Sequence, residues 1–203
     1  MNPLEIQHIT VKSNSLRAEV KCALDMLHVS EDVAKNISAA FPGLSKQLCV
    51  DSDNASNQLH TFKDEIVGTQ TPHLLEHLAI EILGSVYSEA RSEGIILHVP
   101  QFIGNTSWLE EIAKTKSHGY ALMLVRISFQ DDLVALAALK EATRIINTAF
   151  RNANKNSSKT PTNTENDSKD CLQSENNTFT RSLDASGALA RVRTQLISSL
   201  STI

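Results

Sequence analysis

The sequence has few cysteines, few aromatic residues and no excess of basic charge. Its 203 residues include one tryptophan and 4% aromatic residues, and the net charge is -4 at pH 7. The three cysteines, at positions 22, 49 and 171, are widely spaced. This spacing predicts free thiols in a reducing compartment and excludes a disulfide framework or a cysteine-rich metal site. The charge argues against nucleic acid as a partner.

Long apolar runs are also missing. No stretch is long and apolar enough to cross a membrane, and no basic region followed by an apolar one, as in a signal peptide, is present at the N-terminus. We therefore expect a cytoplasmic protein without a membrane partner. A hydrophobic content of 41% in a chain of this length predicts one globular domain with a real core.

The clearest chemical motif is His-x-x-Glu-His at residues 73–77, in the order that inverted zincins use. On a helix, His73 and His77 lie one turn apart on the same face and can both reach one Zn²⁺. Glu76 lies on the same side, where it can accept a proton from water and act as a general base. The spacing therefore predicts a zinc site built from these three residues.

The residues around the motif predict a helix. Thr71 is expected as its N-cap and Pro72 as its first helical residue. The apolar stripe of this helix consists of Leu74, Leu75, Leu78, Ala79, Ile82 and Leu83. Any amphipathic helix, however, has a polar face that can carry histidine and glutamate. The residues alone thus leave two interpretations, a metal site or a solvated and hydrogen-bonded face.

The rest of the chain predicts a mixed α/β (α+β) fold in which helices pack on a small sheet. Strands are expected at residues 4–11, 95–99 and 120–129. Helices are expected at residues 16–27, from Ser30 onward, and at residues 133–150, with a loop at residues 100–108. Residues 44–50 fit either a short helix end or a strand.

Three regions follow from these patterns. Residues 1–150 are expected to form the α/β domain. Residues 151–181 are polar and lack periodicity, which predicts a disordered linker. Residues 182–203 regain a helical period and predict an amphipathic tail helix that docks on the domain's own surface rather than on a membrane or partner.

A longer series of residues extends the motif in both directions. It comprises Phe41-Pro-Gly-Leu, Cys49, Phe62, Gly68-Thr69 and His73-x-x-Glu76-His77-x-Ala79-x-Glu81, and the later segment Ala142-Thr-Arg-Ile-Ile-Asn147. With this order, residues 4–150 resemble the N-terminal domain of cyanophycin synthetases. The resemblance implies a mixed α/β domain associated with cyanophycin, an arginine-substituted poly-aspartate, or with a related peptide.

The resemblance also implies roles for individual residues. His73 and His77 would ligate zinc, with Glu76 as base. The third ligand is expected to be Glu141, because inverted zincins supply a glutamate from a distant helix, or else Glu81, which would alternatively orient His77 without ligating the ion. Further candidates for the third ligand are His98, His118, Asp131 and Asp132.

Three functions remain open at this point. The first is a zinc-dependent, peptidase-like hydrolase of cyanophycin-like or related peptides. The second is a non-catalytic module that binds such a polymer or peptide. The third is an accessory subunit that pairs with a separate ligase. The expected protein partner is therefore either a second copy of this chain, in a homo-oligomer, or a separate ligase. We do not expect polymer synthesis itself, because this sequence contains no counterpart of the ligase regions of a synthetase.

Overall fold

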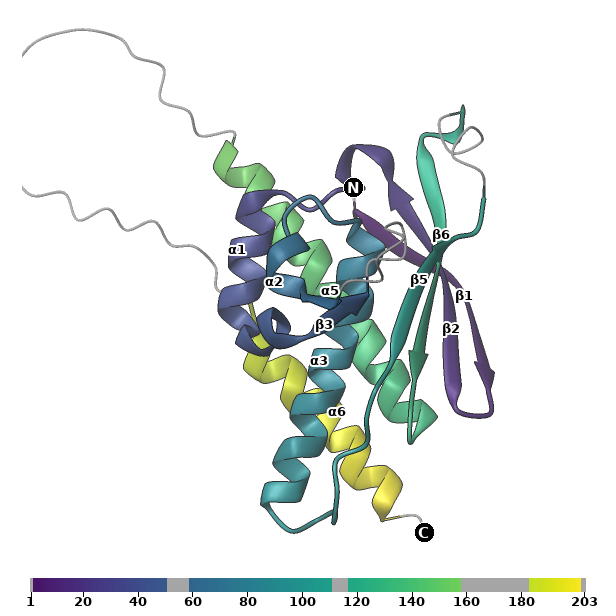
Figure 1. The fold of residues 1–203 in the computed structure, drawn as a ribbon, viewed down its shortest axis with the longest axis vertical. Helices are drawn as coiled ribbons and strands as arrows, with labels where there is room; N and C mark the ends of the chain where they lie inside the picture. The colour runs from purple at the N-terminus through teal and green to yellow at the C-terminus, as the bar shows by residue number, and fades with distance from the viewer. Residues whose placement is uncertain (1, 51–58, 111–116, 158–182, 202–203) are drawn as a thin grey trace, which may run out of the picture.

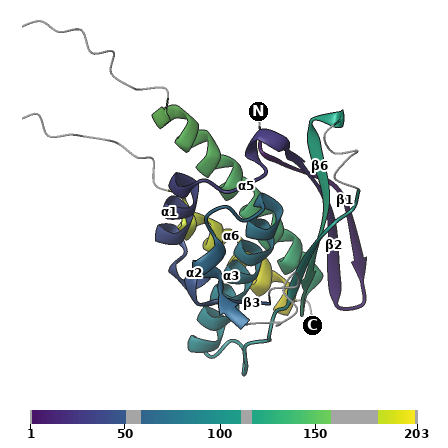
Figure 2. The same cartoon turned by 45° about the horizontal axis from the view of Figure 1, so that its top comes forward.

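The computed structural model describes residues 2–50, 59–110, 117–157 and 183–201. A four-stranded sheet lies along one side of the molecule and the helices along the other (Figures 1 and 2). The strand order is β1 (Leu4–Lys12), β2 (Ser15–Ala23), β6 (Tyr120–Ser128) and β5 (Gly104–Trp108), and every pairing is antiparallel. The predicted mixed fold, a small sheet packed by helices, is confirmed.

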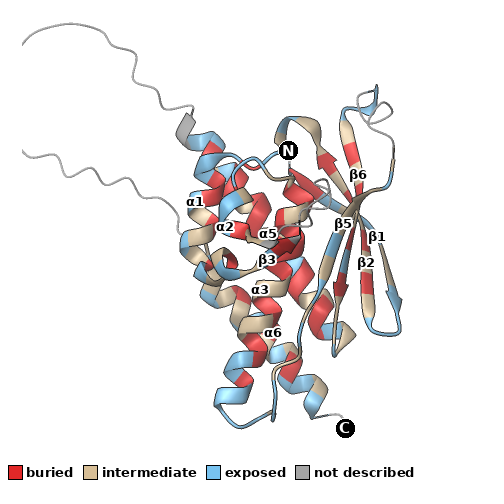
Figure 3. Ribbon diagram, viewed as in Figure 1, coloured by how far each residue is buried: buried red, intermediate tan, exposed pale blue. Residues whose placement is uncertain are grey.

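Two long helices cover one face of the sheet. They are α3 (Thr71–Ser92) and α5 (Asp132–Ser157), and the helices α1 (Glu31–Ala40) and α6 (Ala185–Leu200) pack on them from outside. Buried residues concentrate between the sheet and these helices (Figure 3). The packing follows from alternation in the strands, where every second residue of β2 is buried, and from the apolar stripes of the helices.

The first hairpin corrects one prediction. Residues 16–27 were expected to be helical, but residues 15–23 form β2 and only Leu24–Met26 adopt a helical turn, η1. The buried residues of β2 are Leu16, Ala18, Val20 and Cys22, a period of two that can be mistaken for a helical pattern when alanine and cysteine are not counted as core. A tight turn with Ser13 at a φ of 44° joins β1 to β2.

The segment between α3 and β6 corrects a second prediction. Residues 95–99 were expected to form a buried strand, yet they are irregular, and Leu97 is 93% exposed. The strand is instead β5, within the predicted loop. Its sequence, Gly-Asn-Thr-Ser-Trp, is poor in branched apolar residues because β5 is an edge strand.

The central helix begins close to the predicted position. Its first residue is Thr71 and its N-cap is Gln70, so Thr71 is not the cap that we expected. The Thr71 hydroxyl instead donates to the carbonyl oxygen of Met26 at 2.6 Å, and its backbone N–H donates to the carbonyl oxygen of Leu27. These bonds fix the start of α3 against the chain that follows β2.

Four short elements lie between α1 and α3 in the chain. They are η2 (Pro42–Lys46), β3 (Leu48–Val50), β4 (Leu59–Thr61) and α2 (Phe62–Glu65). Strands β3 and β4 pair with each other and place Cys49 directly opposite His60. Residues 44–50, which the sequence left undecided, thus contain both a helical turn and a strand.

The C-terminal region agrees with the predicted tail helix and shifts one boundary. Helix α5 continues to Ser157, beyond the expected domain end at residue 150. Most of the predicted linker, residues 158–181, lies outside the described residues. Helix α6 docks on the domain through the buried side chains of Ala188, Val192 and Leu196, as expected. In the part of the chain that is described, no helix has the length and apolar character needed to cross a membrane.

Candidate metal centre

Three side chains converge where the β3–β4 hairpin lies against α3. The Nε2 atoms of His73 and His77 are 3.1 Å apart, and the Cys49 Sγ atom lies 3.2 Å from the Nε2 atom of His77. These three ligand atoms all lie within 4.8 Å of one another. The i, i+4 spacing on α3 brings the two imidazoles together, as the sequence predicted, and β3 adds the thiol.

The orientation of His77 is set by Gln47. The Gln47 Nε2 atom donates to the Glu81 carboxylate and to the His77 carbonyl oxygen, both at 3.1 Å. The amide oxygen of Gln47 therefore faces the Nδ1 atom of His77, at 2.7 Å, and accepts its proton in a hydrogen bond. The Nε2 atom of His77 is consequently unprotonated in the neutral ring and can ligate a cation.

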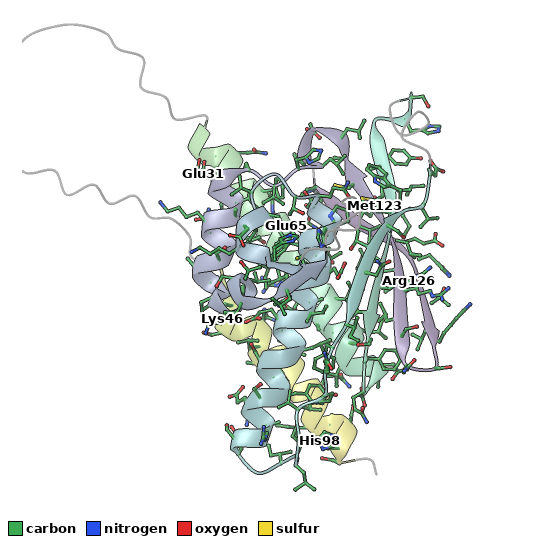
Figure 4. All side chains as sticks on the ribbon, viewed as in Figure 1. Glu31, Lys46, Glu65, His98, Met123 and Arg126 are labelled. Carbon is green, nitrogen blue, oxygen red and sulfur yellow. The ribbon has the colours of Figure 1, made fainter. Side chains whose placement is uncertain are left out.

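A carboxylate orients His73 in the same way. The Nδ1 atom of His73 lies 3.2 Å from Glu65 Oε1 and 3.1 Å from the Thr69 hydroxyl. In the tautomer that carries the proton on Nδ1, this N–H faces the Glu65 carboxylate and the Nε2 atom keeps a lone pair that can ligate a cation. The other oxygen of Glu65 lies 2.6 Å from the Nε2 atom of His60. Figure 4 shows Glu65 among the side chains gathered near α2 and α3.

The two Nε2 atoms face each other across 3.1 Å, a distance at which one ring N–H can donate to the other nitrogen or both nitrogens can bind one cation. Imidazole nitrogens that share a tetrahedral Zn²⁺ lie roughly 3.4 Å apart, and a thiolate sulfur lies roughly 3.6 Å from each. The observed spacings are close to these values. One cysteine and two histidines form a donor set that suits zinc, and each histidine has the partner on Nδ1 that such ligands require.

Burial keeps the ligands uncharged while no ion is bound. It lowers the pKa of His77 to about 3, an effect that His73 reinforces, and it also lowers the pKa of His73. Burial, assisted by Glu65 and Glu76, raises the pKa of the Cys49 thiol to about 12. Neutral imidazoles are the form that binds metal. A bound cation would lower the pKa of the Cys49 thiol again, because it favours the thiolate.

Glu76 lies beside this group but is not part of it. The Thr106 hydroxyl on β5 donates to Glu76 Oε2 at 2.5 Å, so the carboxylate is turned toward the sheet edge. Burial raises the pKa of Glu76 to about 7, although the hydrogen bond from Thr106 by itself lowers this pKa. A Cβ atom at Gly104 would overlap the Glu76 carboxylate, so the glycine makes room for it.

The surroundings of the imidazoles are fixed by close packing. The ring of Phe62, which is fully buried, stacks on His77 with centroids 3.9 Å apart and meets the edge of His73. Gly43 lies against the Glu81 carboxylate, where a Cβ atom would overlap it. Glu81 thereby acts on His77 through Gln47, which matches the orienting role that the sequence left open for it rather than the role of ligand.

The structure does not bring the expected third ligand, Glu141, to this group. The Glu141 carboxylate is bound by Arg144 at 2.7 Å and by Arg191 of α6 at 2.8 Å, and among the described residues it belongs to neither group of converging ligand atoms. Two strong cationic partners explain why it is unavailable as a ligand. The remaining candidates, His98, His118, Asp131 and Asp132, are also absent from these groups.

Sequence reasoning missed the residues that the hairpin contributes. Cys49 and Phe62 appeared only within the family resemblance, and Gln47, His60, Glu65 and Thr106 were not considered for the site. A single cysteine has no spacing signal, because its partners on α3 lie more than twenty residues away. The available signal was that Leu48 and Val50, on either side of Cys49, favour a short strand.

No known family model matches the chain, and neither a curated protein nor a solved structure matches it.

Proposed function

We propose that the protein is a zinc-dependent hydrolase that cleaves amide bonds in peptides, with His73, His77 and Cys49 as ligands and Glu76 as general base. The observation that carries this proposal is the convergence of two imidazole nitrogens and a thiol sulfur, with Glu76 adjacent on the same helix. Three protein ligands leave one position of a tetrahedral ion for water or substrate, as in catalytic rather than structural sites.

The chemistry divides between the ion and the chain. When bound, zinc polarises the scissile carbonyl and makes water a nucleophile near neutral pH. Glu76 accepts the proton of the attacking water and returns it to the leaving amine. Thr106 holds one oxygen of Glu76, and Gly104 gives the carboxylate its space. The His73 side chain is 28% exposed, which gives a substrate access that the buried Cys49 and His77 do not provide.

Within the described parts of the chain β5 is an edge strand of its sheet, and this position supports a peptide as substrate. The ladder bonds from Leu109 to Leu122 and from Ser128 to Ile103 show that the odd-numbered residues of this region face β6. The backbone N–H and C=O groups of Gly104, Thr106 and Trp108 therefore point away from β6, toward the side on which no described strand pairs with β5. An extended peptide that pairs there lies next to Glu76, because Gly104 and Thr106 both contact that side chain.

The test combines metal analysis with cleavage. We expect purified protein to contain zinc and to cleave peptides, with cyanophycin as the first polymer to test because of the sequence resemblance. Glu76→Gln should keep the metal and lower kcat by at least about 100-fold. His77→Ala should lose both metal and activity. A matched control is Glu31→Gln, at an exposed position of α1, which should change neither.

A second function is favoured by the contact between Glu76 and Thr106. If this contact keeps the whole carboxylate turned toward β5 when peptide is bound, neither oxygen of Glu76 reaches the attacking water, and the protein binds peptides or cyanophycin-like polymers at β5 without cleaving them. The same experiment separates the two functions. Cleavage that is unchanged in Glu76→Gln contradicts the proposed mechanism, and binding without cleavage by the zinc-loaded wild type supports the binding module.

A further inference from the structure

A second group of ligand atoms adjoins the first. Cys49, His60 and Glu65 each offer a ligand atom, and these atoms lie within 4.8 Å of one another. The two groups share Cys49, which lies between the imidazole pair on α3 and the side chains from β4 and α2. The β3–β4 register puts Cys49 directly opposite His60, so both side chains lie on the same face of the hairpin.

The hairpin and α2 hold this second group in place. Glu65 ends the single turn of α2, which follows directly after β4. Its two oxygens reach different histidines, His60 at 2.6 Å and His73 at 3.2 Å. The side chains of His60 and Glu65 are 27% and 30% exposed, so a cation can enter from this side while Cys49 remains buried.

The shared sulfur can serve both positions. A sulfur that ligates an ion carries no proton and keeps lone pairs that can bind a second ion. The His60 and Glu65 ligand atoms lie within reach of the same sulfur as the imidazole pair, so a second cation would complete its coordination from the side of β4 and α2.

We propose that the centre binds two divalent ions, the second held by His60, Glu65 and the shared Cys49 sulfur. The inference rests on the proposed zinc site, because the sulfur bridges both positions. Thiolate, imidazole and carboxylate together suit Zn²⁺ rather than Mg²⁺ or Ca²⁺, which prefer oxygen ligands alone. Paired ions act in hydrolysis by stabilising both the attacking and the leaving group.

The test is a titration of the metal-free protein with Co²⁺, followed by the thiolate-to-cobalt absorption and by metal analysis after Zn²⁺ loading and dialysis. We expect the wild type to bind two equivalents. His60→Ala and His60→Gln should each bind one, with the imidazole pair still occupied. His118→Ala, at an exposed histidine outside both groups, should bind two and serves as the matched control.

The outcomes separate this inference from the proposed function. One equivalent in the wild type, or two in both His60 variants, overturns the second ion and leaves the hydrolase proposal standing. No bound equivalent in the wild type overturns both. Circular dichroism of the His60 variants establishes that they are folded, and the second variant keeps a polar side chain at this position.

Discussion

Gln47 is the side chain that links Glu81 to His77, the proposed ligand. Its amide is fixed by three hydrogen bonds, so it holds His77 in the tautomer that leaves Nε2 free. Gln47→Leu removes these bonds at similar volume. We expect the affinity for zinc to fall by roughly 10- to 100-fold, as for other partners of metal-ligating histidines, with the fold retained. Competition against a chromophoric chelator measures this change.

The matched control for that substitution is Gln101→Leu, at an exposed position before β5. It changes the same side chain in the same way without contact to the site, and its zinc affinity should equal that of the wild type. An unchanged affinity in Gln47→Leu would show that His77 does not need this partner, and the geometric basis for the metal centre would then be lost.

Gly104 and Gly84 allow a matched test of Glu76. A Cβ at Gly104 overlaps the Glu76 carboxylate, whereas nothing lies within 4 Å of a Cβ at Gly84 in α3. Gly104→Ala should displace the base and lower kcat by about 100-fold, with little change in zinc affinity. Gly84→Ala should leave kcat unchanged and raise stability by about 0.5–1 kcal/mol. Equal kcat values for the two variants would contradict the placement of Glu76.

At the scale of elements, helix α6 is anchored through Glu141. Burial acts to raise the pKa of the Glu141 carboxyl, but hydrogen bonds from Arg191 and Arg144 outweigh it and hold the pKa below 4.5. A carboxyl whose pKa is lower when folded adds stability that is complete above its unfolded pKa and is lost as the pH falls through its folded pKa. Glu141→Gln should therefore cost about 1–2 kcal/mol at pH 7, since Arg191 is partly exposed.

Urea unfolding of both proteins at several pH values measures this effect. The difference in the free energy of unfolding between wild type and Glu141→Gln should be constant near neutrality and should shrink below about pH 4.5, where the wild-type carboxyl takes up its proton. A difference that does not depend on pH would mean that the ion pair with Arg191 does not hold α6 on the domain.

The elements also show which parts of the molecule the sequence could predict. Strand β6 and helix α5 have long, regular apolar patterns, and both were predicted. Strand β2 was missed because Ala18 and Cys22 are small core residues that weaken its alternation. Strand β5 was missed because its stability comes from pairing with β6 and from α3, and not from its own side chains.

The same distinction applies to the site. His73, Glu76 and His77 lie on one helix, where a period of 3.6 residues determines which side chains share a face, and so their proximity was predictable. Cys49 and Gln47 reach them only because η2 and β3 fold back on α3. That long-range packing leaves no periodic signal, and Glu141 was preferred by analogy although Arg191 neutralises it.

At the scale of the whole molecule, the candidate metal centre lies where the β3–β4 hairpin meets α3. The two strands are only three residues each, and within the described chain they pair with each other and not with the main sheet. An ion bound by Cys49, His73 and His77 therefore couples the hairpin to the core. At zinc concentrations about 100 times the Kd, such binding stabilises the folded state by about 2.7 kcal/mol.

For a chain of this size we expect the Tm to rise by roughly 5–11 °C on zinc addition, and to fall again with a chelator. Hydrogen exchange should slow most in β3 and β4, because these short strands have the lowest stability of their own and gain a link to α3. His73→Ala should show neither change, whereas His98→Ala, at an exposed position, should behave like the wild type. Protection that spreads evenly over the fold, without an excess in the hairpin, would mean that the ion binds elsewhere.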